Sequence, residues 1–121
     1  MPKRLLVVDD DLPLLRMLQR QLAKDGHEVV ACARFEEAKQ FLAREAPDAL
    51  LTDIRLGAFN GLQLVVWAKQ EYPNLPTIVL SAFDDPLLRR EAEGWGATYL
   101  VKPVTRKQLA ECLAGLLAEA A

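Results

Sequence analysis

No apolar run in this sequence approaches the ~20 residues that a helix needs to cross a bilayer. The first such run, Leu5–Val8, stops at three consecutive aspartates, so the N-terminus does not have the pattern of a secretory signal peptide. Cysteine is scarce as well, because Cys32 and Cys112 are the only two, and the chain lacks the disulfide framework of a small secreted protein. We therefore expect a cytoplasmic protein in which both cysteines are buried free thiols.

Charge of one sign is also not in excess. The chain has 15 Lys and Arg residues against 17 Asp and Glu residues, a formal net charge of -2. Domains that bind nucleic acid or a membrane surface usually present a basic patch, so we expect neither kind of contact from this chain. With 121 residues and no repeat, linker or low-complexity tract, residues 1–121 are expected to form a single domain.

Short apolar runs alternate with helical patterns along the whole chain. The predicted strands are Leu5–Val8, Glu28–Cys32, Ala49–Thr52, Thr77–Leu80 and Thr98–Val101. The predicted helices are a stretch closed by Gly26 with Leu15, Leu18 and Leu22 on one face, then Phe35–Glu45, Leu62–Tyr72, Asp84–Glu93, and a last helix that Thr105 can cap. Between the third strand and the third helix, Gly57 and Gly61 bracket a predicted loop.

Five strands that alternate with five helices predict an α/β fold. Short connections and near-continuous apolar strands favour a parallel sheet covered by helices on both faces, which is a three-layer sandwich. In such sheets the functional crevice lies at the carboxyl ends of the strands. The residues that directly follow each strand are therefore the candidate site residues.

Polar residues with complementary chemistry stand at four of these strand ends. Asp9 and Asp10 follow the first strand, Asp53 ends the third, and Ser81 and Lys102 end the fourth and fifth. Carboxylates that converge on one crevice repel one another, and a hard divalent cation such as Mg²⁺ would neutralise them. A carboxylate, a metal, a fixed cation and a hydroxyl donor are the components that phosphoryl transfer requires.

Each of these residues also has a purely structural interpretation. Asp10 or Asp11 could cap the first helix, Asp53 could be a turn residue, Ser81 a strand-end hydroxyl, and Lys102 a solvated lysine. The shared location of all four strand ends on one edge of the sheet favours the functional interpretation.

The same residues resemble the receiver domain of response regulators, the family of two-component signal transduction that includes the chemotaxis regulators. The resemblance covers essentially the whole chain, and its motifs are Leu6–Asp10, Leu51–Ile54, Val79–Ala82 and Tyr99–Pro103. It implies a flavodoxin-like (βα)5 fold with the parallel strand order 2-1-3-4-5. It also implies a cis peptide bond between Lys102 and Pro103.

The resemblance assigns a role to each site residue. Asp53 would accept a phosphoryl group from the phosphohistidine of a sensor histidine kinase or a phosphotransfer protein. Asp10 would bind Mg²⁺ directly and Asp9 partly through water, and Asp53 and the backbone carbonyl of Arg55 would complete the protein ligands. Such a domain catalyses only its own phosphorylation and dephosphorylation, so we do not expect an enzyme acting on a separate substrate.

The resemblance further implies a switch. Ser81 and Lys102 would hold the phosphoryl oxygens, and the ring of Tyr99 would then swing from solvent into space beneath the fourth helix. The change would be read on the face formed by the fourth helix, the fifth strand and the fifth helix. The partner on that face would be an effector domain, another protein or a second copy of the chain.

Three positions, Gly57, Arg55 and Trp95, depart from the usual family pattern. Trp95 stands between Gly94 and Gly96, where a small residue is more usual. Gly57 stands where many members have proline, four residues after the phosphoacceptor. Arg55 places a large basic side chain beside the site, where it could limit water access or steer the donor. Apart from these departures, Phe83, two residues after Ser81, could gate the crevice or could be an ordinary exposed aromatic of a loop.

Two other functions remain open from the residues alone. An Mg²⁺-dependent aspartate phosphohydrolase of the haloacid dehalogenase type would use Asp9 and Asp11 as its Asp-x-Asp pair, but Asp84 and Asp85 are poorly placed as its later acidic pair. A flavodoxin-like carrier of FMN would need a Ser-, Thr- or Gly-rich phosphate loop after the first strand, where three aspartates would repel the phosphate.

Overall fold

Five parallel strands form the central sheet of this protein, for which the computed structural model describes residues 3–56 and 58–120. These strands are β1 (Arg4–Val8), β2 (Glu28–Cys32), β3 (Ala49–Asp53), β6 (Thr77–Ser81) and β7 (Thr98–Val101). Their spatial order is β2-β1-β3-β6-β7, and every neighbouring pair is parallel. Counted along the chain within this sheet, the order is 2-1-3-4-5, which confirms the predicted flavodoxin-like α/β fold.

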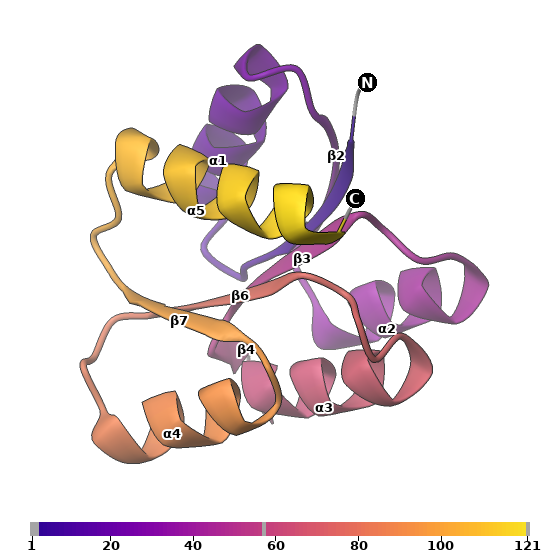
Figure 1. Ribbon diagram of the computed structural model, residues 1–121, viewed down its shortest axis with the longest axis vertical. Coiled ribbons are helices and arrows are strands. Elements are labelled where there is room, and N and C mark those ends of the chain that lie inside the picture. The colour runs from indigo at the N-terminus through magenta and orange to yellow at the C-terminus, as the bar shows by residue number, and fades with distance from the viewer. Residues whose placement is uncertain (1–2, 57, 121) are drawn as a thin grey trace.

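Helices cover both faces of the sheet and complete the three layers (Figure 1). They are α1 (Leu12–Lys24), α2 (Phe35–Arg44), α3 (Gly61–Glu71), α4 (Pro86–Gly94) and α5 (Arg106–Ala120). Helices α1 and α5 lie on one face, and α2, α3 and α4 lie on the other (Figure 1). The predicted three-layer sandwich is therefore confirmed.

Alternating side chains of each strand supply the two halves of the core. Leu5 and Val7 of β1 pack in the cluster that contains the buried leucines of α1 and α5, whereas Leu6 and Val8 pack with α2 and α3. Successive side chains of a strand point to opposite faces, so a strand covered on both sides must be apolar throughout. This requirement explains why β1 appears in the sequence as an unbroken apolar run.

Side-chain caps set the points at which several helices begin. Asp11, rather than Asp10, caps α1, because its Oδ1 accepts a hydrogen bond of 3.2 Å from the backbone N–H of Leu14. Asp85 and Thr105 cap α4 and α5 in the same way, as the sequence predicts for Thr105. Capping satisfies backbone donors that would otherwise lack partners at the first turn. The capping role at α1 thus belongs to Asp11.

A short hairpin replaces the loop predicted between the third strand and the third helix. Strands β4 (Arg55–Leu56) and β5 (Phe59–Asn60) pair in antiparallel fashion. Gly57, which stands where many family members have proline, lies outside the described residues. A strand of two residues is too short to show the alternation of apolar and polar residues from which strands are predicted. Helix α3 then begins at Gly61, behind a capping box formed by Asn60.

Both cysteines are free thiols, as predicted. Cys32 is buried as expected, whereas Cys112 is only half-buried. Burial raises the pKa of each thiol above its ordinary value. Within the part of the chain that the structure describes, no helix is both long and apolar enough to cross a membrane.

The first residue of α3 approaches the end of β3 very closely. The backbone N–H of Gly61 donates a hydrogen bond of 2.6 Å to the carbonyl of Ile54. A Cβ atom built on Gly61 would lie only 2.0 Å from the backbone oxygen of Asp53. Because that neighbour is backbone rather than a flexible side chain, only glycine fits here without moving the chain that carries Asp53.

We expect Gly61→Ala to lower the free energy of unfolding by about 1–3 kcal/mol, the usual cost of forcing an extra methyl group into a packed site. Urea denaturation followed by circular dichroism measures this difference. The matched control is Gly115→Ala in α5, where an added Cβ meets nothing within 4 Å and should stabilise the helix by up to about 1 kcal/mol. Equal stabilities for Gly61→Ala and the parent protein would contradict the close approach.

Candidate functional site

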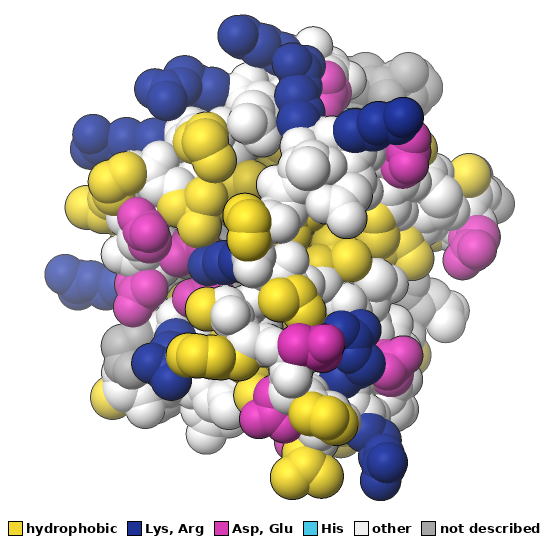
Figure 2. Space-filling model, turned by 90° about the vertical axis from the view of Figure 1, so that its left-hand side faces the viewer, with side chains coloured by type: hydrophobic (Ala, Val, Ile, Leu, Met, Phe, Trp, Pro, Cys, Tyr) yellow, Lys and Arg dark blue, Asp and Glu magenta, His cyan; other side chains and the backbone are white. Residues whose placement is uncertain are grey.

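Strand register brings the predicted site residues to one edge of the sheet. In the ladders, Val8 pairs with Thr52, and Ser81 pairs with Val101. Asp9, Asp53 and Lys102, which directly follow Val8, Thr52 and Val101, therefore lie at the same edge of the sheet, at the carboxyl ends of the parallel strands. This edge faces the viewer in Figure 2, where acidic, basic and hydrophobic side chains lie side by side.

Three carboxylates meet at this edge. Asp9, Asp10 and Asp53 each offer one oxygen, and these oxygens all lie within 4.8 Å of one another. Asp9 and Asp53 are buried, whereas Asp10 is exposed. The three acidic residues predicted to surround a metal are thus brought together, although Asp53 is far from the other two in sequence.

Asp9 is the most deeply enclosed of the three, with a side chain that is 1% exposed. Its Oδ1 accepts a hydrogen bond of 2.9 Å from the backbone N–H of Asp11. Burial raises the pKa of Asp9, and the neighbouring charge of Asp53 adds to this effect. The bond from Asp11 and the ammonium of Lys102 act in the opposite direction without cancelling it.

Lys102 bridges two of these carboxylates. Its Nζ lies 2.9 Å from Oδ1 of Asp53 and 3.2 Å from Oδ2 of Asp9. Burial alone would lower the pKa of Lys102, but the hydrogen bond to Asp53 and the two negative charges outweigh it, so the pKa is raised. The ammonium is therefore a fixed positive charge. The peptide bond between Lys102 and Pro103 is cis, as predicted.

The donor set fits a hard divalent cation. Three carboxylates against one ammonium leave an excess of negative charge, and carboxylate oxygens are the ligands that Mg²⁺ prefers. Asp9, Asp10 and Asp53 are the side chains that would hold it. That the backbone carbonyl of Arg55, in β4, completes the ligand set stays a prediction.

Ser81 lies at the end of β6, next to β3, and is fully buried. Its Oγ accepts a hydrogen bond of 3.1 Å from the backbone N–H of Phe83. A serine hydroxyl can accept and donate at the same time, so this bond leaves the hydroxyl proton available for a further acceptor.

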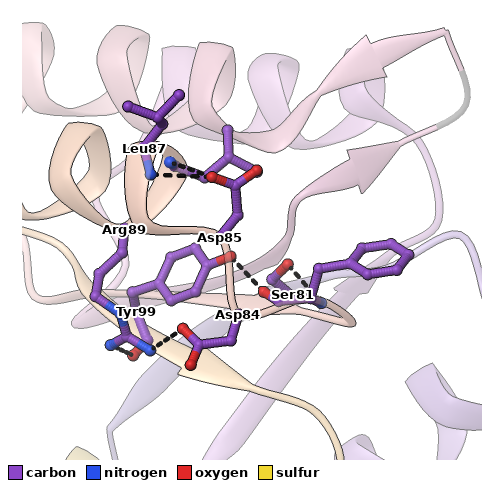
Figure 3. Close-up of polar contacts among 8 residues, drawn as sticks. Ser81, Asp84, Asp85, Leu87, Arg89 and Tyr99 are labelled. Atoms are coloured by element: carbon purple, nitrogen blue, oxygen red, sulfur yellow. Dashed lines mark hydrogen bonds and ion pairs between the residues drawn. The ribbon is translucent and has the colours of Figure 1, made fainter.

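Tyr99 lies inside the protein and not in solvent, which corrects the predicted starting position of its ring. The residue is 4% exposed, and its ring packs in the cluster that contains Val79 and Ala92. Its hydroxyl donates a hydrogen bond of 2.7 Å to the backbone carbonyl of Phe83 (Figure 3). Burial of a tyrosine is favourable when its hydroxyl has such a partner.

The backbone of Phe83 therefore joins the two predicted switch residues. Its N–H donates to Ser81, and its carbonyl accepts from Tyr99 (Figure 3). The residue sequence could not indicate this link, because both contacts use main-chain atoms that every residue possesses. The phenyl side chain itself is 56% exposed, and the guanidinium of Arg55 stacks 5.3 Å from its ring centroid.

Comparison with known proteins agrees with this geometry. The model of the response regulator receiver domain family matches residues 5–114. The response regulator protein FleR of Pseudomonas aeruginosa is 35% identical over 115 residues, covering 94% of this chain and 24% of FleR. The DNA-binding transcriptional regulator NtrC of Proteus hauseri is 39% identical over 101 residues, covering 80% of this chain and 21% of NtrC. The chain thus spans about a fifth to a quarter of the length of these curated relatives.

A solved structure gives the same result for the fold. A CheY-like response regulator receiver domain protein from Methanospirillum hungatei superposes with a TM-score of 0.94 at 28% identity, covering 98% of this chain and 96% of that chain. The family match, this superposition and the acidic cluster at the carboxyl edge of the sheet agree. The chain belongs to the response regulator receiver domain family, whose members are signalling domains.

Proposed function

We propose that residues 1–121 act as a single receiver domain in which Asp53 is the phosphoacceptor. The donor would be the phosphohistidine of a sensor histidine kinase or a phosphotransfer protein, and the reaction would take place in the cytoplasm. The observation that carries this proposal is the position of Asp53, which lies among the carboxylates of Asp9 and Asp10 and 2.9 Å from the ammonium of Lys102.

The proposed transfer follows from the chemistry of these groups. The Asp53 carboxylate attacks phosphorus and forms a P–O bond, while the P–N bond of the phosphohistidine breaks and the imidazole keeps the electron pair. Lys102 and Ser81 supply a positive charge and a hydroxyl donor to the phosphoryl oxygens. A Mg²⁺ ion bound by Asp9, Asp10 and Asp53 would supply further positive charge there. The domain acts only on itself, in phosphorylation and in dephosphorylation.

The positions of Asp9 and Asp11 speak against the dehalogenase type of phosphohydrolase. That mechanism requires Asp9 as the nucleophile and Asp11 as its partner. Asp9 is enclosed and bound by Lys102 and by the Asp11 backbone, and the Asp11 carboxylate caps α1. Neither side chain is free for the role that the alternative assigns to it.

We propose that Ser81 and Tyr99 transmit the signal through Phe83. When the Ser81 side chain moves toward a phosphoryl oxygen, its Oγ leaves the Phe83 N–H and this bond weakens. The Phe83 carbonyl holds the Tyr99 hydroxyl, so a shift of this backbone reaches β7 and the neighbouring α4. Because the ring is already buried, the motion begins in the loop after β6 and not with a ring in solvent. A few kcal/mol of differential binding are enough to reverse such a two-state population.

The output surface would be the face formed by α4, β7 and α5. Its partner would be an effector domain, a separate protein or a second copy of this chain, without direct contact between this domain and nucleic acid. Relatives such as the DNA-binding transcriptional regulator NtrC are much longer than this chain, which supports an effector domain as the first candidate.

We expect the protein to gain one phosphoryl group when it is incubated with Mg²⁺ and acetyl phosphate or a phosphorylated histidine kinase. Intact-mass spectrometry should detect this group, and Asp53→Asn should abolish it because the amide is not a nucleophile of comparable strength. The control Asp11→Asn should still be labelled, since asparagine also caps helices well. Labelling of Asp53→Asn at Asp9 would instead support the dehalogenase alternative.

Mg²⁺ affinity tests the ligand set separately. We expect Asp10→Asn to weaken Mg²⁺ binding by about tenfold, ~1.4 kcal/mol, because a charged oxygen ligand is lost. Isothermal titration calorimetry measures the difference, with Asp11→Asn as the matched control at the next position. Equal affinities for Asp10→Asn and the parent protein would remove Asp10 from the ligand set.

A further inference from the structure

Arg89 of α4 contacts two segments that the proposed switch couples, the loop after β6 and strand β7. Its guanidinium stacks 4.8 Å from the ring centroid of Tyr99. One arm, Nη1, donates a hydrogen bond of 3.4 Å to the backbone carbonyl of Tyr99, and the other arm, Nη2, lies 3.0 Å from Oδ1 of Asp84 (Figure 3).

These contacts join the loop after β6 to the middle of β7. Asp84 directly follows Phe83, whose backbone holds Ser81 and Tyr99. One planar guanidinium thus binds the loop through Asp84 and the strand through Tyr99. The fork of an arginine suits this task, because its donors point in different directions at the same time and its face can stack on an aromatic ring.

The contacts oppose any outward rotation of the Tyr99 ring. The ring is buried, and it can reach solvent only if it leaves the face of Arg89 and if its hydroxyl leaves the Phe83 carbonyl. The side chain of Arg89 is 37% exposed, and that of Asp84 is 70% exposed, so the stacking on the ring lies deeper than the ion pair with Asp84.

We propose that Arg89 is a positioning residue, a latch that holds Tyr99 in its buried orientation and thereby strengthens the binding of a phosphoryl group at Asp53. The first part, that Arg89 holds the ring, is argued only from the contacts of Arg89 with Tyr99 and Asp84. The second part, the effect on Asp53, rests on the proposed function. Coupling between two sites is reciprocal. In the proposed switch a phosphoryl group at Asp53 favours the buried orientation of the Tyr99 ring. Whatever loosens the ring must therefore weaken a phosphoryl-like ligand at Asp53.

Arg90 provides a matched control on the same turn of α4. It is exposed, and no hydrogen bond or ion pair joins it to the part of the chain that the structure describes. Replacing Arg90 changes the net charge and the helix surface as much as replacing Arg89 does, but it leaves the latch intact.

Fluorine NMR of the protein labelled with 3-fluorotyrosine tests the hold on the ring. The chain has two tyrosines, so Tyr72→Phe assigns the signals. In Arg89→Gln we expect the ratio of buried to solvent-exposed Tyr99 signal to fall about two- to fivefold, the value of one cation–π contact near the surface. Arg89→Lys should recover only part of the ratio, because one ammonium cannot bind Asp84 and stack on the ring in the same way. Arg90→Gln should match the parent protein.

Titration with beryllofluoride in the presence of Mg²⁺ tests the effect on Asp53. We expect Arg89→Gln to bind this phosphoryl mimic more weakly than the parent protein and Arg90→Gln to bind it equally well.

An unchanged Tyr99 signal in Arg89→Gln, or an equal change in Arg90→Gln, would contradict the claim that Arg89 holds the Tyr99 ring. A loosened ring with unchanged beryllofluoride affinity would overturn its effect on Asp53. Failure of the parent protein to bind beryllofluoride would overturn the proposed function, while the NMR result still decides whether Arg89 holds the ring.

The Tyr72 signal and the thermal midpoint report whether each variant folds. If Arg89→Gln does not fold, Asp84→Asn removes only the exposed arm of the latch and should shift the Tyr99 ratio in the same direction by a smaller factor. An unchanged ratio in a folded Asp84→Asn variant would then overturn the bridge between the loop and β7.

Discussion

Mutual repulsion among Asp9, Asp10 and Asp53 is the constraint on which the site depends. Carboxylates whose oxygens lie within 4.8 Å of one another are unfavourable unless positive charge compensates them. The ammonium of Lys102, held at the end of β7, supplies part of that charge. The remaining negative charge is of the kind that a bound divalent cation would neutralise. The sheet and its helices hold these carboxylates together against this repulsion.

The space around Asp53 is set by backbone as much as by side chains. Gly61 allows α3 to begin against the Asp53 carbonyl, and the backbone of Phe83 links Ser81 to Tyr99. Packed interiors do not deform gradually, so under the proposed function a change at Asp53 would be passed on as a shift between discrete arrangements. Arg89 lies where such a shift would have to pass from the loop to the strand.

Much of the fold could be predicted from residue patterns. Apolar runs such as Leu5–Val8 revealed the buried strands, and the cap at Thr105 was correct. The β4–β5 hairpin was not predicted, because two residues on each strand have no period. The choice between Asp10 and Asp11 as the cap of α1 also needed coordinates, since both are good capping residues.

The sequence by itself determined the fold class, the family and which residue types stand at the strand ends, because these depend on local periodicity and on motifs in a known order. The tertiary structure alone decided that Tyr99 is buried, that Lys102 binds both Asp9 and Asp53, and that Arg89 stacks on Tyr99 while binding Asp84. Such contacts depend on side-chain direction and on distances between separate elements. Neither is set by local sequence, because both arise only when the helices pack on the sheet.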